Sequence, residues 1–383
     1  MLLNDTQKAV RDEIRTFAQA EIRPRSAEFE AAGAFPPDLF TKLGELGLMG
    51  MMAPEELGGA SLDTVSYVLA LMEIAAADGA LSTILSIQNS LLVNGIARFG
   101  SKAQKERFLP DLISGRMIGA FALTEADAGS DAAAIRVRAT RTQDNRAGSN
   151  SDGYVLNGAK QFISSGRIAG VAMVVAVTDP AAGRKGISTF LVPTDSPGYF
   201  VDKVERKLGQ GASDTCAIRF EDLFVPRDLM LGEEGHGYSI ALANLEAGRV
   251  GIGAQSVGMA QAALEIAVDY ARDRKSYGKP IIEHQAVGFR LADLATKLEA
   301  ARQLVLHAAA TRDAGEPALK LASMAKLFAS ETSEEVVSGA IQTLGGYGYL
   351  EEFGLAKIYR DVRVCQIYEG TSDIQKMVIS RAL

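Results

Sequence analysis

Residues 171–177 read VAMVVAV and residues 187–192 read ISTFLV, and these two apolar runs indicate the fold class. Each run has the length of a buried strand and lies between clusters of Gly, Pro, Asp and Asn. They belong to a region, from about 116 to 230, that predicts a small β-barrel or β-sandwich. The polar stretch TRTQDNRAGSNSDG at 140–153 is expected to form an exposed hairpin tip.

Helical patterns lie on both sides of this region. In the first 115 residues, apolar side chains recur at helical spacing, as at Val10, Ile14, Phe17 and Ile22. Long helical patterns return near the C-terminus, at 238–274, 284–313, 317–343 and 355–381. Four helices of that length bury their apolar faces as a bundle. We therefore predict a multidomain α+β fold with three parts: an N-terminal helical domain (1–115), a middle β-barrel or sandwich domain (116–232) and a C-terminal four-helix bundle (233–383).

Composition and element order exclude several classes of protein. The α–β–α order fits neither a doubly wound sheet nor a TIM barrel, and no GxGxxG follows a strand. A diffuse net charge of −7 argues against a nucleic-acid binder. Cys216, Cys365 and the three histidines are scattered, so we expect neither a disulfide framework nor a metal site. Lacking an apolar signal core, the protein is expected to be cytoplasmic in a bacterium, or in an organellar matrix after processing, without membrane insertion.

The segment IYEGTSDIQ at 367–375 contains the best candidate for a catalytic group. Glu369 precedes Gly370, which allows a ligand to approach the backbone closely. A carboxylate in an apolar cleft has a raised pKa, as a general base requires. The alternative is an ordinary helix start, with Thr371 or Ser372 as the cap and Glu369 exposed.

Three further segments could bind a phosphate or a dinucleotide. In FALTEADAGSD (121–131), Thr124, Ser130 and backbone amides could cradle a phosphate or the edge of a flavin, or the segment could be a plain turn. In RKSYGKP (274–280), Arg274 could pair with a pyrophosphate or simply complement a helix end. In QTLGGYGYL (342–350), the glycines permit close approach of a dinucleotide, or stop a helix.

These segments occur in a characteristic order. The motifs TEADAGSD, KQFISSG, LEAGR, RKSYGKP, QTLGGYGY and YEGTSDIQ follow one another between residues 121 and 375. In this order the chain resembles the acyl-CoA dehydrogenase family over essentially its whole length. That family has a helical domain, a β domain and a four-helix domain, which is the order predicted above.

The resemblance implies an activity. Such an enzyme oxidises an acyl-CoA thioester to the trans-2-enoyl-CoA, with Glu369 removing the α proton and N5 of non-covalently bound FAD accepting the β hydride. The thioester oxygen would accept a hydrogen bond from the backbone N–H of the base. Electrons would pass to electron-transferring flavoprotein, and the chain would form a homotetramer. LEAGR and the C-terminal segment look similar to short-chain and short branched-chain members. The alternatives are an acyl-CoA oxidase that uses oxygen, or an inactive homologue that binds FAD or acyl-CoA.

The resemblance also assigns residues. Those implied to contact FAD are Phe121, Leu123, Thr124, Ser130, Phe162, Ser164, Arg274, Ser276, Tyr277, Gln285, Gln342, Gly345, Gly346, Thr371 and Asp373. Gln285 and the 342–346 segment would serve the FAD of a neighbouring subunit. Those implied to contact the acyl-CoA are Ser130, Glu246, Arg249, Tyr368 and Gly370.

Two positions depart from the family pattern, and a third decides which of two locations for the base applies here. Ala126 stands where a Pro is usual, which loosens a turn but leaves the donors around it in place. Phe162 stands where a Trp is common, which keeps an aromatic wall and loses an indole N–H. Some subfamilies place their base just before the Arg of LEAGR. Here that residue is Gly248, so Glu369 is the single candidate.

Overall fold

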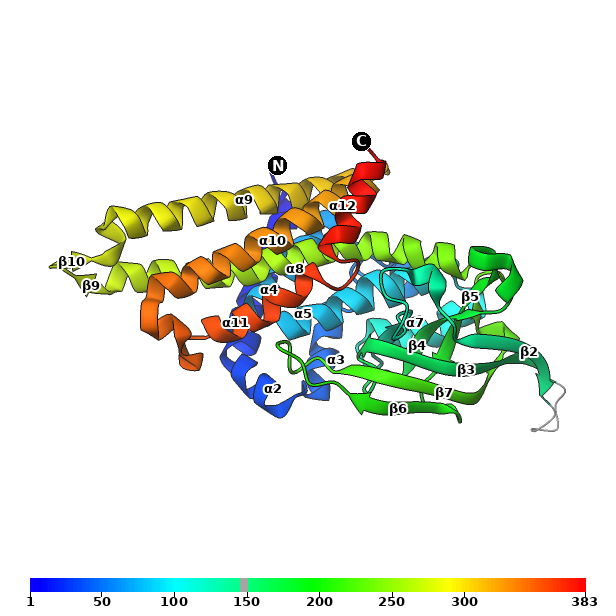
Figure 1. Ribbon diagram of the computed structural model, residues 1–383. Coiled ribbons are helices and arrows are strands. Elements are labelled where there is room, and N and C mark those ends of the chain that lie inside the picture. The colour runs from blue at the N-terminus through cyan, green and yellow to red at the C-terminus, as the bar shows by residue number, and fades with distance from the viewer. Residues whose placement is uncertain (145–150) are drawn as a thin grey trace.

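The computed structural model describes residues 1–144 and 151–383, and its sheet lies at one end, with the long helices extending away from it (Figure 1). The N-terminal part is helical. Its α-helices are α1 (Asp5–Phe17), α2 (Ser26–Ala32), α3 (Pro37–Glu45), α4 (Thr64–Ala77), α5 (Gly79–Ser86), α6 (Asn94–Phe99) and α7 (Lys102–Ile113). Capping boxes start two of them: Asn4 with Gln7 at α1, and Ser101 with Gln104 at α7.

One helical stretch is apolar enough for a membrane span. Residues Gly79–Phe99, which comprise α5, a π-helical segment and α6, reach a mean hydropathy of 1.2 over an 18-residue window. Within the fold, 89% of that window is buried against the rest of the chain. In this fold the stretch is therefore part of the buried helical core.

The middle part contains the sheet. Its strands are β1 (Gly119–Ala122), β2 (Arg138–Asp144), β3 (Ser151–Ser164), β4 (Val171–Val177), β5 (Ile187–Pro193), β6 (Tyr199–Val204), β7 (Thr215–Pro226) and β8 (Met230–Leu231). They pair in the order β6-β7-β3-β2-β4-β5-β8, with β1 parallel to β4. The predicted runs 171–177 and 187–192 are the antiparallel pair β4 and β5. Residues 140–144 and 151–153 of the predicted hairpin tip are instead paired strand residues of antiparallel β2 and β3, and residues 145–150 lie outside the described residues.

The sheet folds into two halves that share one core. β2 meets β4 only at Arg138 and Val177, so the sheet bends there. As a result the ring of Tyr154 on β3 packs against that of Phe190 on β5, with 5.2 Å between the centroids. Buried residues of both halves belong to a single hydrophobic cluster, which gives this part the two-layered core of a sandwich.

The C-terminal part is a bundle of long helices. Its elements are α8 (Gly237–Asp273), a short hairpin of β9 (Lys275–Ser276) and β10 (Lys279–Pro280), α9 (Gln285–Asp313), α10 (Leu319–Leu344), α11 (Leu355–Val362) and α12 (Ser372–Arg381). The prediction of one helix over 355–381 was wrong. Glu369 and Gly370 have φ values of 53° and 91°, and two successive left-handed residues cannot continue an α-helix.

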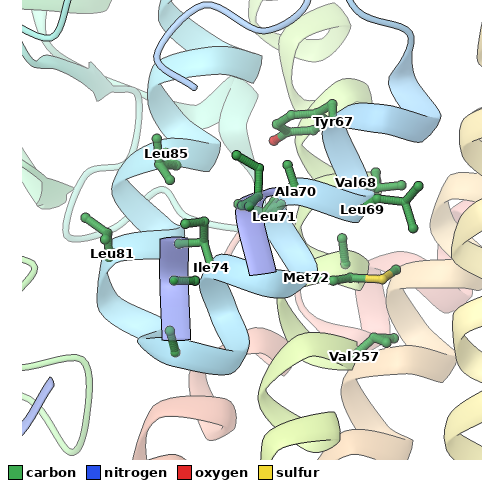
Figure 2. Packing of buried hydrophobic residues seen from close by; sticks show 14 of the residues in the cluster. Tyr67, Val68, Leu69, Ala70, Leu71, Met72, Ile74, Leu81, Leu85 and Val257 are labelled. Carbon is green, nitrogen blue, oxygen red and sulfur yellow. The ribbon is translucent and has the colours of Figure 1, made fainter. Parts of the chain in front are cut away.

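Helix α8 is the central element because it packs against N-terminal helices, α9, α10 and the sheet. Every residue of α4 is buried. Figure 2 shows Leu71 and Met72 of α4 and Val257 of α8 among the packed side chains of this core. The two backbones approach very closely at Gly258, where a Cβ atom would collide with the carbonyl oxygen of Met72. The packing of α4 on α8 therefore requires glycine at this position.

We predict that Gly258→Ala lowers the melting temperature clearly, by a loss of about 1–3 kcal/mol, because the helices must separate to admit the methyl group. The matched control is Gly253→Ala in the same helix. There the nearest atom is a side-chain methyl of Val305 at 2.9 Å, which can move, so the loss is smaller. Thermal unfolding of both variants measures the difference, and equal losses would contradict the close approach of the two backbones.

Candidate active site

Glu369 lies in the turn before α12, and its side chain points into the protein. Thr371 caps α12 by accepting a hydrogen bond from the N–H of Ile374 at 3.3 Å, so one half of the helix-start alternative holds. The other half fails, because the Glu369 carboxylate lies against α8 and is not exposed. A Cβ atom on Gly248 would overlap its Oε2 atom. Only glycine at position 248 leaves room for this carboxylate.

The Glu369 carboxylate lies in a desolvated environment. Its Oε2 atom is buried and has no hydrogen-bond partner in the described part of the chain. Burial raises the pKa of Glu369 from 4.5 to about 7, and the nearby cations Arg249 and Lys326 oppose that shift. A carboxylate with a pKa near 7 and an unpaired oxygen can accept a proton at neutral pH.

Residues on α8 next to Gly248 contribute two of the predicted acyl-CoA contacts. Arg249 is buried, and its Nε atom has no hydrogen-bond partner among the described residues. Burial lowers the pKa of Arg249, while the carboxylates of Glu369 and Glu246 oppose that shift. The half-buried Glu246 thus lies near the same cation. A buried donor and a buried acceptor without partners mark a place where a polar ligand group fits.

The hydroxyl of Tyr368, a predicted acyl-CoA contact, takes part in a hydrogen-bond network with side chains of three other segments. It donates to Gln255 on α8 and lies 3.4 Å from Thr83 on α5 and 3.4 Å from the amide of Gln210. Burial raises the pKa of this phenol well above its usual value, so it stays protonated. Sequence reasoning did not identify Gln255, Thr83 or Gln210, which close the space behind the turn.

The segment after β1 and the end of β3 lie side by side. The carbonyl oxygen of Thr124 accepts from the N–H of Gln161 at 2.9 Å. The buried ammonium of Lys160 donates to the Leu123 carbonyl and to Glu125, each at 2.8 Å. These bonds bring the segment of Phe121, Leu123 and Thr124 next to the end of β3 that carries Phe162 and Ser164, and the surface they form is here called the wall.

Phe162 shows that this wall is open to a ligand. Its φ is 60°, a strained value for a bulky residue, at an irregularity in the pairing of β3 with β7. The side chain is 62% exposed. Phe121 and Leu123 pack near Leu245 of α8, one turn before Gly248. The wall and the Glu369 carboxylate therefore meet the same stretch of α8. Ser130 is exposed in the loop that follows Thr124.

The remaining predicted residues form a second group at the far end of the bundle, here called the distal group. It consists of Arg274, Ser276, Tyr277, Gln285, Gln342, Gly345 and Gly346. The Arg274 guanidinium lies 5.8 Å from the ring of Tyr347, which ties the hairpin to the glycine segment after α10. The hairpin lies at the end of the bundle away from the sheet (Figure 1). Asp273, where α8 ends, is 25 residues after Gly248, or about 37 Å along the helix.

The structure thus gathers the predicted site residues into two places. Thr371 and Gly370 belong to the turn with Glu369, while Asp373 is exposed in the first turn of α12. The distal group is too far along α8 to meet a ligand that also touches the wall beside Glu369. The wall beside Glu369 and the distal group are therefore two separate surfaces of one chain.

Comparison with known proteins covers the whole chain. Family models match in three parts: acyl-CoA dehydrogenase, N-terminal domain at residues 4–116, middle domain at 120–223 and C-terminal domain at 235–383. A Bacillus subtilis protein named acyl-CoA dehydrogenase is 45% identical over 100% of this chain and 99% of its own length. The mitochondrial short-chain specific acyl-CoA dehydrogenase of Bos taurus is 43% identical over 99% of this chain and 90% of its own length.

Solved structures agree with these matches. Butyryl-CoA dehydrogenase from Megasphaera elsdenii has a TM-score of 0.95 and 39% identity, covering 100% of this chain and 99% of that one. A chain from a structure titled as the electron transferring flavoprotein of Acidaminococcus fermentans also has a TM-score of 0.95, with 40% identity over 100% of this chain and 98% of that one. These matches confirm the predicted multidomain α+β fold and the resemblance that the ordered motifs indicated.

We predict that Glu369→Gln stabilises the protein at alkaline pH. A carboxylate whose pKa is raised on folding binds its proton more tightly in the folded state, so folded-state stability falls as pH rises from 4.5 to about 7. The full cost above that range is about 3 kcal/mol. Glutamine carries no such cost. The advantage of the variant should therefore grow by about 2 kcal/mol between about pH 5.5 and about pH 8.

Thermal and urea unfolding at the two pH values measure this effect. The control is Glu352→Gln, which removes an exposed carboxylate. A pH-independent difference between wild type and Glu369→Gln would show that the carboxylate is solvated.

Proposed function

Since the chain belongs to the acyl-CoA dehydrogenase family, whose members are FAD-binding oxidoreductases, we propose that it dehydrogenates a short acyl-CoA thioester between Cα and Cβ, with Glu369 as the base. The observation that carries the proposal is the buried, unpaired carboxylate of Glu369 against Gly248. An arrangement that only capped a helix would leave this side chain in water. The proposed FAD is non-covalently bound.

The wall beside the base suits a flavin. Phe162 offers an exposed aromatic face on strained backbone, and Phe121 and Leu123 add apolar surface next to it. Thr124, Ser130 and Ser164 supply hydroxyl groups around this surface. These residues would hold the ring system of FAD, and FAD when bound supplies the two-electron acceptor for the hydrogen that leaves Cβ.

The residues of the chain would carry out proton transfer, stabilisation of the thioester oxygen and CoA binding. Glu369 accepts the α proton, and its pKa of about 7 balances basic strength against availability of the ionised form. Its backbone N–H would donate to the thioester oxygen and stabilise the charge that develops there. Arg249 and Glu246 would contact the CoA portion. Gly248 keeps the carboxylate free to reach the substrate, because any side chain there would occupy its place.

A short acyl chain is favoured by the space around Gly248. Ile252 and Gln255 follow it on the same face of α8 at helical spacing and are buried. The Gln255 amide donates to Thr83 at 2.6 Å, and its oxygen accepts from Tyr368. A longer acyl chain on this side would have to break buried hydrogen bonds, which costs free energy. This supports the short-chain preference that the sequence motifs indicated.

For the electron acceptor we propose electron-transferring flavoprotein. The chain resembles dehydrogenases in length and motif order, and one structurally similar chain comes from a study of such a flavoprotein. An acyl-CoA oxidase is the competing function, and oxygen consumption with substrate alone would identify it. A homologue that binds FAD or acyl-CoA without turnover would have no need of a buried carboxylate with a raised pKa.

We predict that Glu369→Gln keeps its fold and its FAD but loses dehydrogenation by roughly 10²–10⁴-fold, since removing a general base costs that much. Glutamine has nearly the same size but cannot take the proton. The measurement is flavin bleaching after anaerobic mixing with a panel of short acyl-CoA thioesters, repeated with an artificial electron acceptor. Glu352→Gln is the control. Rapid bleaching by the Glu369 variant would exclude Glu369 as the base.

We also propose a homotetramer made of two dimers, in which the distal group of one copy contacts the FAD held by the wall of another. Several apolar side chains at the distal end are exposed in the single chain: Tyr277 by 98%, Tyr349 by 85% and Phe289 by 67%. Tyr277 also has a left-handed φ of 49°. An exposed aromatic surface of this kind is typical of an interface.

We predict that Arg274→Ala weakens FAD retention about tenfold or more, because a cation beside the FAD phosphates is lost in a neighbouring copy. The control, Arg272→Ala, removes an exposed arginine two residues earlier that pairs with Asp269 and should retain FAD normally. Flavin absorbance after gel filtration and sedimentation velocity measure retention and assembly. An active, FAD-loaded monomer would contradict the shared site.

A further inference from the structure

The turn that carries Glu369 has an unfavourable backbone conformation. Glu369 and Gly370 both have positive φ, at 53° and 91°, and a glutamate in that region is disfavoured without external support. Strained turns at functional sites persist only where the surrounding structure holds them. Other groups of the protein must therefore hold this turn in place.

Two side chains donate hydrogen bonds to the carbonyl groups of the turn. The ammonium of Lys326 on α10 donates to the Gly370 oxygen at 2.8 Å. The amide of Gln375 on α12 donates to the same oxygen at 2.9 Å and to the Glu369 oxygen at 3.2 Å. Both side chains are fully buried, at 0% exposure. The turn is therefore held from two helices that approach it from different directions.

Lys326 differs from two other lysines that lie largely inside the fold, the buried Lys160 and the partly buried Lys357. Lys160 pairs directly with a carboxylate, at 2.8 Å from Glu125. Lys357 pairs with Asp78 and Asp361 at 3.1 Å and 2.6 Å. Lys326 instead donates to a backbone carbonyl, and Glu369 is among the charges that act on it. A buried lysine usually requires a paired anion, so a location beside the base and its turn points to a functional reason.

We propose that Lys326 is a positioning residue for the reaction: its ammonium holds the Gly370 carbonyl so that the turn directs the Glu369 carboxylate onto Gly248, and its charge faces that carboxylate. This inference rests on the proposed function of Glu369 as the base. Lys326 touches neither the reacting atoms nor the wall residues in the structure, and it acts through the turn.

The other groups around the carboxylate are known from the structure. Arg249 approaches from α8, and the hydroxyl of Tyr67 from α4 is close enough for the carboxylate to raise its pKa further. Cys365, just before the turn, is buried and its thiol pKa is raised by that burial, so it stays neutral. Glu331 on α10 also acts on Lys326. Lys326 and Arg249 are thus the two cations that act on Glu369.

Burial lowers the pKa of Lys326 to about 8. Its positive charge is therefore present at neutral pH and is lost as pH rises through about 8. With Glu369 ionising near pH 7, the dehydrogenation rate of the wild type should rise through about 7 and fall above about 8.

The test compares Lys326→Met, which removes charge and hydrogen bond, with Gln375→Met, which removes hydrogen bonds only. We expect a 10–100-fold lower kcat in Lys326→Met with little change in KM, and an acid-limb pKa about one unit higher because a cation is gone. Gln375→Met should lower kcat without moving that pKa. Lys320→Met, a change of the same charge on the same helix, is the control and should match the wild type.

A second measurement needs no turnover. In the Lys326→Met background, adding Glu369→Gln should raise the melting temperature at pH 8 more than it does in the wild type, because the unpaired carboxylate becomes costlier to bury. The Lys320→Met background should show the wild-type increment. Equal increments in all backgrounds would overturn the proposal, as would a Lys326→Met enzyme with normal kcat and pH profile.

The outcomes also separate this inference from the proposed function. If the wild type fails to bleach with every acyl-CoA, the proposed function is wrong, while the melting increments still report the Lys326–Glu369 interaction. If Lys326→Met does not fold, Lys326→Arg, which keeps the charge, and Gln375→Met decide the matter. We expect Lys326→Arg to keep the acid-limb pKa and to lose the fall in rate above about pH 8, because arginine stays charged there. A normal kcat in Gln375→Met, together with a fall above about pH 8 that persists in Lys326→Arg, would overturn the proposal.

Discussion

The contact between the Glu369 carboxylate and Gly248 is the constraint on which the rest of the site depends. A carboxylate can lie against a helix backbone only where that helix lacks a Cβ atom, and α8 meets this condition at position 248. The close contact excludes water from one side of the carboxylate, and this burial raises its pKa to about 7. Steric fit and proton affinity therefore have the same origin in one missing side chain.

Helix α8 transmits this constraint to the other parts of the fold. Its first turns pack on the wall formed by Phe121 and Leu123, its middle receives the carboxylate, and its last residue leads into the distal group. The glycine contact with α4 at Gly258 fixes the helix against the N-terminal core. A shift or rotation of α8 would thus alter the wall, the surroundings of the Glu369 carboxylate and the distal group together.

A buried polar network fixes the turn from behind. Asp78 caps α5, pairs with Lys357 and lies near Asp361, whose carboxylate also accepts from the backbone N–H of Gln210. Gln210 comes from the loop between β6 and β7 and reaches the hydroxyl of Tyr368. Side chains of the N-terminal helices, the β region and the C-terminal bundle therefore meet at Tyr368, the residue before Glu369. Such a network is favourable only when its members are satisfied, which requires the three parts to adopt one relative arrangement.

The sequence predicts the fold well where hydrophobic periodicity is strong. It predicts the fold less well where hydrogen bonds from distant side chains determine the backbone conformation. VAMVVAV and ISTFLV became the paired strands β4 and β5, and three of the four long helices near the C-terminus ended close to the expected residues. The expected helix at 355–381 is divided into α11, which ends at Val362, and α12, which begins at Ser372. The left-handed turn at Glu369 and Gly370 between them is held by tertiary contacts that local spacing does not reveal.

The supporting residues of the site were harder to find for the same reason. Glu369 stands in a recognisable motif, whereas Gln375 and Gln255 are single amides on helical patterns, and their hydrogen bonds join segments distant in sequence. Lys326 did leave a signal: it is the one charged residue in LASMAKLFAS, on a helix face that is otherwise apolar or small. A lone charge in such a stretch is either at the surface or bound to something inside. Here the partner is the turn that carries Glu369, so the helix pattern together with burial identifies a residue that the motif alone does not contain.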